Sequence, residues 1–205
     1  MAVREILRYP MDKKGLRKPS RPILEINREA ASLITDLKET LLAHREGIGL
    51  AAPQINRHLR AVVVRLGSSG DGELNQPEPP LALLNPEIID AGDPRLDFDG
   101  CLSFPGLYGK TVRPHFLHVT GWDEDGKPFR RVFEGFDAVL VHHEIDHLNG
   151  VLFIDRARTP EDLYRVGVNE EGEHVRLSLT DAERQLYLRD RLGQNVISPE
   201  LNPER

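Results

Sequence analysis

The chain has 205 residues, of which 39% are hydrophobic, and a formal net charge of −6. This length suffices to bury one hydrophobic core, so we expect a single domain over residues 1–205. The acidic balance argues against direct, general nucleic-acid binding. Residues 1–8 lack the apolar stretch of a secretion signal, and runs such as Ala61–Val64 are too short to span a bilayer. We therefore expect a cytoplasmic protein with no membrane partner.

An amphipathic helix is the first long element that the sequence predicts, over about residues 26–44. Its apolar side chains are those of Ile26, Ala30, Leu33, Leu37 and Leu41. Because they recur every three or four residues, they lie on one face of the helix and predict its burial against the rest of the protein.

A glycine-rich segment follows this helix and reads Gly47-Ile48-Gly49-Leu-Ala-Ala-Pro-Gln54. Glycines let a backbone approach a ligand closely and leave its N–H and C=O groups free for pairing. The amide of Gln54 can donate a hydrogen bond to a carbonyl oxygen that becomes negative as water adds to the carbonyl. Taken alone, the segment is equally explained by a turn before a strand.

Short strands and turns are predicted between this segment and residue 133. The predicted strands are Ala61–Leu66, Leu81–Leu84, Leu117–Trp122 and Phe129–Phe133. Asp125-Gly126 predicts a hairpin turn between the last two of them. Residues 67–80 are rich in glycine, serine and proline, and we expect them to form a polar surface loop.

The single cysteine, Cys101, lies between glycines and a proline in residues 99–106. One cysteine cannot form an intramolecular disulfide, which fits a reducing compartment. A lone cysteine is usually a small buried residue. The glycines and the proline around this one instead indicate a shaped loop that presents the thiol.

The segment from His143 to His147 has the pattern H-E-x-x-H, and Asn149-Gly150 after it predicts the end of a helix. On a helix, residues four apart lie on one face, so the two histidines can bind one metal ion. Glu144 points to an adjoining sector, where its carboxylate can manage the proton of a water molecule without binding the metal. A solvated helix with two surface histidines is the alternative for these five residues alone. A third ligand, for which Cys101 is the candidate, distinguishes the two.

Cys101, His143 and His147 together form a ligand set with a fourth position open to water. This set suits iron(II), zinc, nickel or cobalt and does not choose between them. A thiol binds metal as the thiolate, so metal binding should weaken as the pH falls. The pattern therefore predicts a metallohydrolase.

The three motifs G-x-G-x-A-A-P-Q, G-C-L-S and H-E-x-x-H occur in this order and at these separations, and the chain resembles peptide deformylase over about residues 3–160. Further matching segments are Ile6–Pro10, Leu16-Arg17, Leu84–Glu87, Val112–Pro114 and His147–Gly150. The resemblance implies an α+β fold in which antiparallel β-sheets pack around a central metal-binding helix. It also implies an enzyme that removes the formyl group from the N-terminal formylmethionine of newly synthesised proteins, releasing formate.

The resemblance further implies roles for individual residues. Ferrous iron (Fe2+) would be the ion held by the three ligands, and Glu144 would be the general acid and base. Gln54 and the backbone N–H of Leu102 would stabilise the oxyanion. The peptide would bind as an added β-strand along Ile48 and Gly49, with Gly47 supporting the segment. The residues expected to form the pocket for the methionine side chain are Ile48, Phe136, Val139 and Leu140, for each of which an ordinary core position is the alternative.

Three features depart from the usual family pattern. Asp99 replaces a glutamate that pairs with an arginine at the position of Arg113 and holds the cysteine loop. Because aspartate is one methylene shorter, we expect a looser or water-bridged pair. His142 replaces a glutamine and lies about 100° around the helix from His143, so we expect it in a second layer or at the surface. Residues 104–109 lack an arginine that many members carry, which bears on substrate preference and turnover.

After about Thr159 the resemblance fades. Thr180-Asp-Ala-Glu183 predicts a capping box at the start of a short helix, and Pro199 and Pro203 predict a loose end. This tail could dock on the body, mediate a dimer or contact the ribosome; nascent formylmethionyl peptides are the expected main partner. Two alternatives to an active deformylase stay open. One is a non-catalytic metal-binding relative, and the other is a metalloprotease or other amidase with the same ligands.

Overall fold

The computed structural model describes residues 3–67, 79–169 and 171–191. Most of the predicted loop over residues 67–80, and both Pro199 and Pro203, lie outside these ranges. The helices are α1 (Lys13–Leu16), α2 (Arg28–Ala43), α3 (Gly135–Leu148) and α4 (Asp181–Asp190), with short 3-10 helices at Ala52–Ile55, Phe153–Arg156 and Pro160–Asp162. The strands are β1 (Gly49–Ala51), β2 (Ala61–Val64), β3 (Leu81–Gly100), β4 (Leu107–Trp122), β5 (Pro128–Glu134), β6 (Leu163–Val168) and β7 (His174–Ser178).

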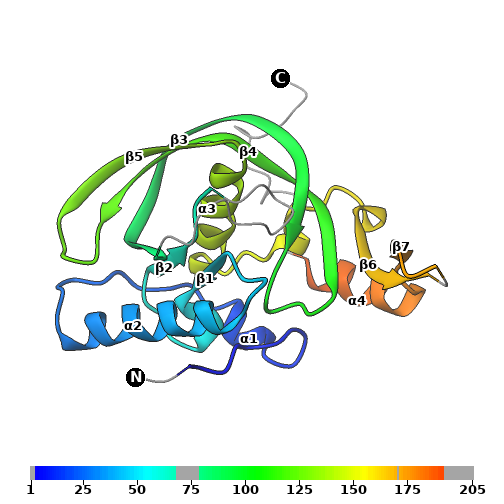
Figure 1. The fold of residues 1–205 in the computed structure, drawn as a ribbon, viewed down its shortest axis with the longest axis horizontal. Helices are drawn as coiled ribbons and strands as arrows, with labels where there is room; N and C mark the ends of the chain where they lie inside the picture. The colour runs from blue at the N-terminus through cyan, green and yellow to red at the C-terminus, as the bar shows by residue number, and fades with distance from the viewer. Residues whose placement is uncertain (1–2, 68–78, 170, 192–205) are drawn as a thin grey trace.

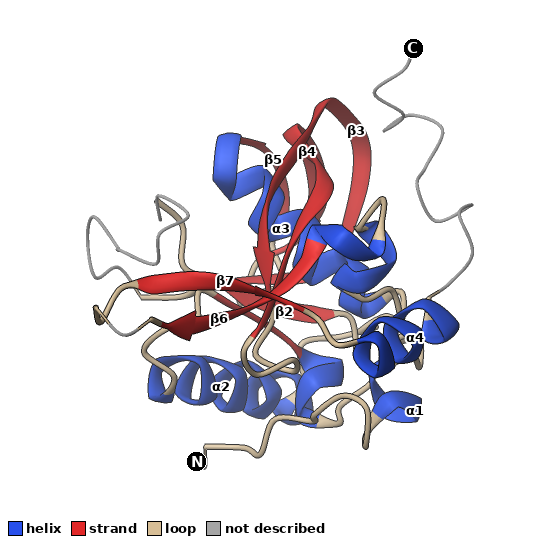
Figure 2. Cartoon of the chain, turned by 90° about the vertical axis from the view of Figure 1, so that its right-hand side faces the viewer, coloured by secondary structure: helices blue, strands red, loops and turns tan. Residues whose placement is uncertain are grey.

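The described strands form one seven-stranded sheet in the order β1-β2-β3-β4-β6-β7, and β5 pairs with β4 beside this path. Every pairing in it is antiparallel. The long strands β3 and β4 arch over α3, and α2 lies below, beyond β1 and β2 (Figure 1). In the side view of Figure 2, β6, β7 and α4 face the viewer. The predicted fold class, antiparallel sheet around a central helix, is the one observed.

Helix α3 is buried on all sides, since every residue from Ala138 to Leu148 is buried. A helix in this position needs no polar outer face, because strands β4 and β5 and strands β1 and β2 all pack against it. Its apolar side chains pack with those of β2, β4 and β5 in one cluster, for example Val141 and Ile145 with Leu117 and Phe133. Polar residues at the centre of α3 are therefore held in a rigid, largely water-free surrounding.

Helix α2 agrees with its prediction to within two residues at each end. Its first turn is capped by Asn27, whose Oδ1 accepts a hydrogen bond from the Ala30 N–H at 3.0 Å. The predicted apolar face is buried through Leu33, Leu37 and Leu41. It packs on β1 and β2 and so supports the glycine-rich segment from below.

Two strands are far longer than the sequence predicted. Strand β3 continues past Leu84 to Gly100, and β4 begins at Leu107 instead of Leu117. Register shifts between Leu84 and Glu87 and again between Ile88 and Asp90 absorb residues that interrupt the alternation of side chains. The predicted hairpin at Gly126 is correct, with a φ of 80° at this glycine. Strands β1, β6 and β7 were not predicted.

The capping box at the start of α4 is confirmed, since Glu183 N–H donates to Thr180 Oγ1 and Thr180 N–H donates to a Glu183 oxygen at 2.9 Å. This helix docks on the N-terminal segment through Asp190. The Asp190 carboxylate accepts a hydrogen bond from the Tyr9 hydroxyl at 2.5 Å and lies 2.5 Å from Lys13 Nζ. The described part of the tail therefore docks on the body of the protein, which is one of the three roles expected for it. Among the described residues, no helix combines the length and apolar character needed to cross a membrane.

Candidate active site

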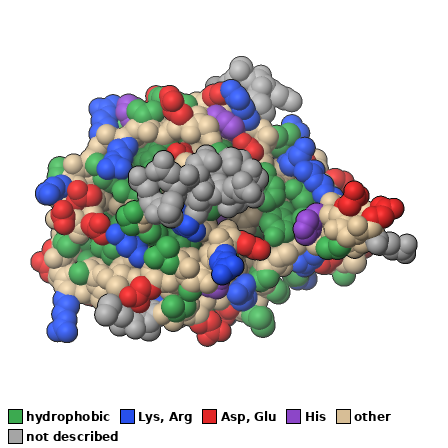
Figure 3. Space-filling model, viewed as in Figure 1, with side chains coloured by type: hydrophobic (Ala, Val, Ile, Leu, Met, Phe, Trp, Pro, Cys, Tyr) green, Lys and Arg blue, Asp and Glu red, His purple; other side chains and the backbone are tan. Residues whose placement is uncertain are grey.

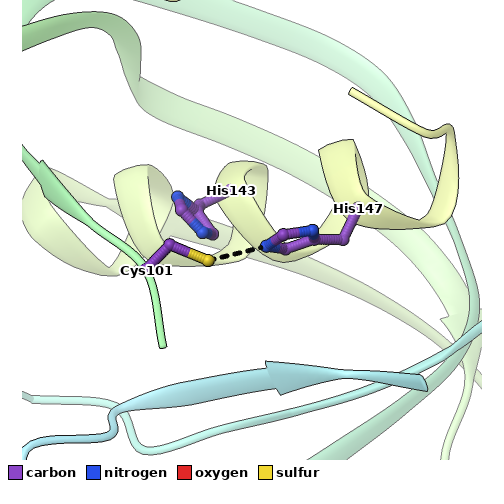
Figure 4. Close-up of side chains that lie close together, drawn as sticks. All are labelled: Cys101, His143 and His147. Carbon is purple, nitrogen blue, oxygen red and sulfur yellow. Dashed lines mark hydrogen bonds between the residues drawn. The ribbon is translucent and has the colours of Figure 1, made fainter. Parts of the chain in front are cut away.

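The three predicted metal ligands come together in the structure, although they belong to two distant segments. Cys101 follows the last residue of β3, and His143 and His147 project from successive turns of α3 (Figure 4). One ligand atom of each lies within 4.8 Å of the others. Cys101 Sγ is 3.3 Å from His147 Nε2. A thiol and two imidazoles at this separation fit a small divalent ion of borderline softness.

His143 is oriented by Asp99. Its Nδ1 lies 2.7 Å from Asp99 Oδ1, which leaves Nε2 as the atom that can bind a metal. Burial disfavours the charged imidazole, but the Asp99 carboxylate outweighs burial and raises the pKa of His143 well above its ordinary value. Burial and then the neighbouring His143 lower the pKa of His147. Asp99 thus favours the protonated form of His143, whereas burial favours the neutral form of His147.

The contact between Asp99 and Arg113 is direct, so the expected loose or water-bridged pair is wrong. Arg113 donates to Asp99 Oδ2 from Nε at 2.9 Å and from a terminal nitrogen at 2.8 Å. Thr111 Oγ1 donates to the same oxygen at 2.7 Å. The shorter aspartate suffices because the guanidinium of the fully buried Arg113 lies within hydrogen-bond distance of the carboxylate. These donors and the positive charge hold the pKa of Asp99 well below its usual range despite its burial.

His142 belongs to a second layer and is not a ligand, as predicted. It is buried, and burial lowers its pKa to about 3, so the ring is neutral. Its Nδ1 lies 2.7 Å from a terminal nitrogen of Arg113, from which a neutral imidazole accepts a hydrogen bond. His142 thus fixes the guanidinium that in turn holds Asp99.

Sequence reasoning missed two buried residues that extend this network. Arg113 also pairs with Asp146, and Asp146 Oδ1 accepts a hydrogen bond from Arg156 at 2.6 Å. Burial raises the pKa of Asp146, but the guanidinium groups of Arg156 and Arg113 outweigh burial and depress it. Sequence reasoning could have found Asp146 from its position inside the H-E-x-x-H pattern, three residues after His143. A carboxylate at that spacing faces the same side of a buried helix and requires a partner.

Glu144 is buried beside the ligands, as the motif predicts for a carboxylate that does not bind metal. Its Oε2 has no hydrogen-bond partner among the described residues. Burial raises its pKa to about 7, and the negative charge of Asp99 acts in the same direction. A carboxyl group with this pKa exchanges protons readily near neutral pH.

Gln54 and Leu102 are the next neighbours of Cys101. Gln54 Oε1 accepts a hydrogen bond from the Ala51 N–H at 2.8 Å, which points the amide nitrogen toward the cysteine loop. That nitrogen lies 3.5 Å from Cys101 Sγ and 3.2 Å from Ser103 Oγ. The Leu102 carbonyl accepts from Arg8 at 3.0 Å, and the Leu102 N–H has no acceptor within the described ranges. Both predicted oxyanion donors therefore lie next to the ligands.

The glycine-rich segment forms β1 and passes directly beside Glu144. A Cβ atom at Gly49 would lie 2.2 Å from Glu144 Oε1 and 2.9 Å from Leu140 Cδ1. A Cβ atom at Gly47 would lie 3.1 Å from Leu102 Cδ1. The two glycines thus let the segment pack closely on the catalytic helix and on the cysteine loop.

The residues predicted for the methionine pocket divide into two groups. Phe136 and Val139 are seven and four positions before His143, and so share its helix face. Leu140 is buried and packs with the core, and Ile48 is half-buried against the same cluster. Leu140 and Ile48 therefore occupy core positions, the alternative expected for them, and this does not exclude contact with the substrate.

The sequence profile of the family described as polypeptide deformylase matches residues 3–162. The chain belongs to the peptide deformylase family. A peptide deformylase of Psychrobacter arcticus is 33% identical over 204 residues, which cover 99% of this chain and 98% of that protein. One from Synechococcus sp. (strain RCC307) is 44% identical over 150 residues, covering 72% and 71% of the two chains.

Solved structures of peptide deformylases have the same fold. The enzyme from Legionella pneumophila aligns with a TM-score of 0.67 at 32% identity, covering 92% of this chain and 93% of that one. The enzyme from Synechococcus elongatus, solved in complex with actinonin, aligns with a TM-score of 0.66 at 38% identity, covering 75% and 79%. The family and the fold class inferred from the three motifs are therefore confirmed.

Proposed function

We propose that this peptide deformylase removes the formyl group from the N-terminal formylmethionine of newly synthesised proteins. The observation that supports this activity most strongly is the convergence of the Cys101–His143–His147 cluster with a buried oxygen of Glu144 that has no hydrogen-bond partner in the described part of the chain. Family membership favours it over the alternatives of a non-catalytic relative or a metalloprotease.

In this proposal Cys101, His143 and His147 hold the metal ion, which we take to be Fe2+. Zinc, nickel and cobalt remain compatible with the same ligands. When bound, the ion acts as a Lewis acid that polarises the formyl group and makes water more acidic. Asp99 and Arg113 keep the His143 ring in position for this role.

The chain's own residues move the protons. Glu144 accepts a proton from the water that adds to the formyl carbon. The Gln54 amide and the Leu102 N–H donate hydrogen bonds to the oxygen that becomes negative. Glu144 then returns the proton to the departing nitrogen as the carbon–nitrogen bond breaks. The products are formate and a free N-terminus, and the pKa of about 7 suits Glu144 to both transfers.

We propose that the peptide binds beside β1, with its backbone along Ile48 and Gly49. The methionine side chain would lie against Phe136 and Val139 on the His143 face of α3, with Leu140 and Ile48 closing the pocket. We further propose that residues 1–205 act as one catalytic domain in the cytoplasm, where nascent chains are made. A transient contact with the ribosome would follow from the nature of the substrate.

The test is an assay of formate release from formyl-Met-Ala-Ser, with metal analysis of protein purified without air. Formate release at turnover rates, with about one ion per chain, is the expected result. Bound metal without formate would indicate the non-catalytic relative instead. Cleavage of internal peptide bonds would indicate a protease.

A further inference from the structure

Charge is unevenly distributed along the chain. Residues 1–66 contain 13 lysines and arginines against seven acidic residues, whereas the whole chain has 27 against 33. The net charge of −6 thus arises from the remainder of the chain, and residues 1–66 are basic on their own. On the face that Figure 3 shows, basic and acidic side chains are interspersed. A place where cations gather without matching carboxylates is therefore a candidate site for an anion.

One such place is a hollow of about 460 Å³ between residues 18–21, residues 56–59 and the start of α2. We call it the basic hollow. Its volume lies within the range of sites for small molecules and exceeds what a single ion needs. The polar residues that line it are Lys18, Arg21, Glu29, Asn56, Arg57 and His58.

Backbone hydrogen bonds hold the two loop segments of the basic hollow together. The Arg21 N–H donates to the His58 carbonyl at 3.1 Å, and the Arg60 N–H donates to the Arg21 carbonyl at 2.9 Å. Asn56 has a φ of 58° and ends the 3-10 helix that precedes the second segment. The fold of the backbone therefore brings the cations together against their mutual repulsion.

The cations of the basic hollow outnumber its carboxylates. Glu29 is the one acidic residue among the described residues that line it, and its Oε1 lies 2.9 Å from Arg57 Nη2. Lys18 and Arg21 are exposed, and their side chains form no ion pair within the described ranges. Like charges that lie close together repel each other, and an anion between them removes this repulsion. The hollow thus has two positive charges in excess, which fit a doubly charged anion.

His58 responds to the positive charge of the hollow. Burial lowers its pKa, and the charge of Lys18 lowers it further. The His58 Nδ1 is buried and has no hydrogen-bond partner in the described part of the chain. An anion bound beside Lys18 would offset the charge of this lysine and so raise the pKa of His58.

We propose that the basic hollow binds a phosphate group, held by the Lys18 ammonium and by the guanidinium groups of Arg21 and Arg57. A phosphate fits better than a carboxylate, because its oxygens can accept hydrogen bonds from several cations and a guanidinium binds two of them at once. The volume admits this phosphate as part of a larger molecule, either a free nucleotide or a polynucleotide. The site is separate from the Cys101 cluster and does not depend on the proposed function.

The experiment is calorimetric titration of the full-length, metal-loaded protein at constant ionic strength. The probes are inorganic phosphate, adenosine monophosphate and an oligouridine RNA. Lys18→Gln and Arg21→Gln should each weaken binding about tenfold, the effect of losing one partly exposed charge-assisted hydrogen bond. Glu29→Gln should strengthen binding about threefold, because it removes a repelling carboxylate and frees Arg57.

The matched control is Lys14→Gln, which removes the same charge from an exposed lysine of α1 that does not line the hollow. It should keep the parental affinity. The probes also distinguish the source of the phosphate. An RNA that binds more tightly than the mononucleotide, with an affinity that falls as salt rises, identifies a polynucleotide. A mononucleotide that binds as tightly as the RNA, or more tightly, identifies a free nucleotide.

Three results would overturn the proposal. The first is that no probe binds to the parent. The second is parental affinity in Lys18→Gln and Arg21→Gln, which would place the anion elsewhere, for example at the metal ion. The third is equal weakening by Lys14→Gln and Lys18→Gln, which would indicate diffuse attraction and no defined site. The pKa of His58, followed by NMR, gives an independent check, since saturation with phosphate should raise it and an unchanged value would place the anion away from the hollow.

Discussion

The Cα of Gly49 lies against the carboxylate of Glu144, so closely that a methyl group on this glycine would be 2.2 Å from Glu144 Oε1. The strand proposed to pair with the peptide therefore also defines the position of the general base. This contact depends on the lack of a side chain and not on backbone conformation, because the φ of Gly49 is not among the positive values.

We expect Gly49→Ala to displace the Glu144 carboxylate and to lower kcat by about 10²-fold, the usual effect of misplacing a catalytic group by roughly 1 Å. Metal content should be unchanged, since the three atoms nearest to the new methyl group belong to Glu144 and Leu140 and not to a metal ligand. The matched control is Gly92→Ala, where the nearest atom, Phe116 Cδ1, would be 3.8 Å from the new Cβ. A Gly49→Ala enzyme with parental kcat would show that Glu144 tolerates the displacement.

Glu144→Gln should retain the metal and the fold but lose about 10²–10⁴-fold in kcat, because an amide can neither accept nor return the proton. Formate release and metal content measured on the same preparation give the comparison. Turnover within tenfold of the parent would refute the role of Glu144.

The pKa of Glu144 also predicts a dependence of stability on pH in the metal-free protein. Burial raises this pKa from the ordinary value of 4.5 to about 7, so the folded state binds the proton more tightly than the unfolded state. The contribution to stability is present below pH 4.5 and is lost as the pH rises to about 7, amounting to about 3 kcal/mol. Glu144→Gln has no such proton. We therefore expect the free energy of unfolding of Glu144→Gln, relative to that of the parent, to be higher at pH 8 than at pH 5. Urea titrations of the two metal-free proteins at both pH values measure this difference.

Removing a metal ligand should abolish metal binding and activity together. Cys101→Ala and His147→Ala each leave two ligands, fewer than the three that hold an ion with one open site. Cys101→Ser is less informative, since its oxygen can retain some metal. Stoichiometric metal and normal turnover in Cys101→Ala would show that the centre is assigned wrongly.

The sequence predicted the metal-ligand cluster better than the sheet around it, for a physical reason. The spacing of His143 and His147 is a property of any α-helix, so the pattern alone determines that both face one ion. Strand β3, in contrast, contains Pro86 and Pro94 and has positive φ values at Asn85 and Asp93, features that interrupt the pattern of a strand. Pairing with β4 along most of its length keeps it extended, and such long-range pairing is not visible in local sequence.

Cross-strand neighbours are the part of the structure that sequence reasoning could not supply. Tyr108 and Tyr164 meet only because β4 pairs with β6, and both lay in segments without a predicted strand. The reach of Asp99 was misjudged for a similar reason. Side-chain length was known, but the separation between Asp99 and Arg113 depends on how β3 and β4 curve over α3.

The direct contact of Asp99 with Arg113 and His143 leads to the last prediction. Asp99→Ala leaves the buried Arg113 with Asp146 as its one charged partner among the described residues and frees His143 Nδ1, so we expect a loss of about 3–5 kcal/mol in the free energy of unfolding. Metal affinity should fall by about 10–100-fold, because the ring of His143 is no longer oriented.

Asp99→Glu provides the contrasting variant. If the pair were loose, the added methylene would improve it, but here the carboxylate is already saturated with donors in a packed interior. Overpacking should therefore cost about 1–3 kcal/mol in the free energy of unfolding while the carboxylate remains available to His143. Urea unfolding and metal titration of both variants test whether Asp99→Ala loses more stability and more metal affinity than Asp99→Glu. An Asp99→Glu protein more stable than the parent would mean that the longer side chain relieves strain at this position.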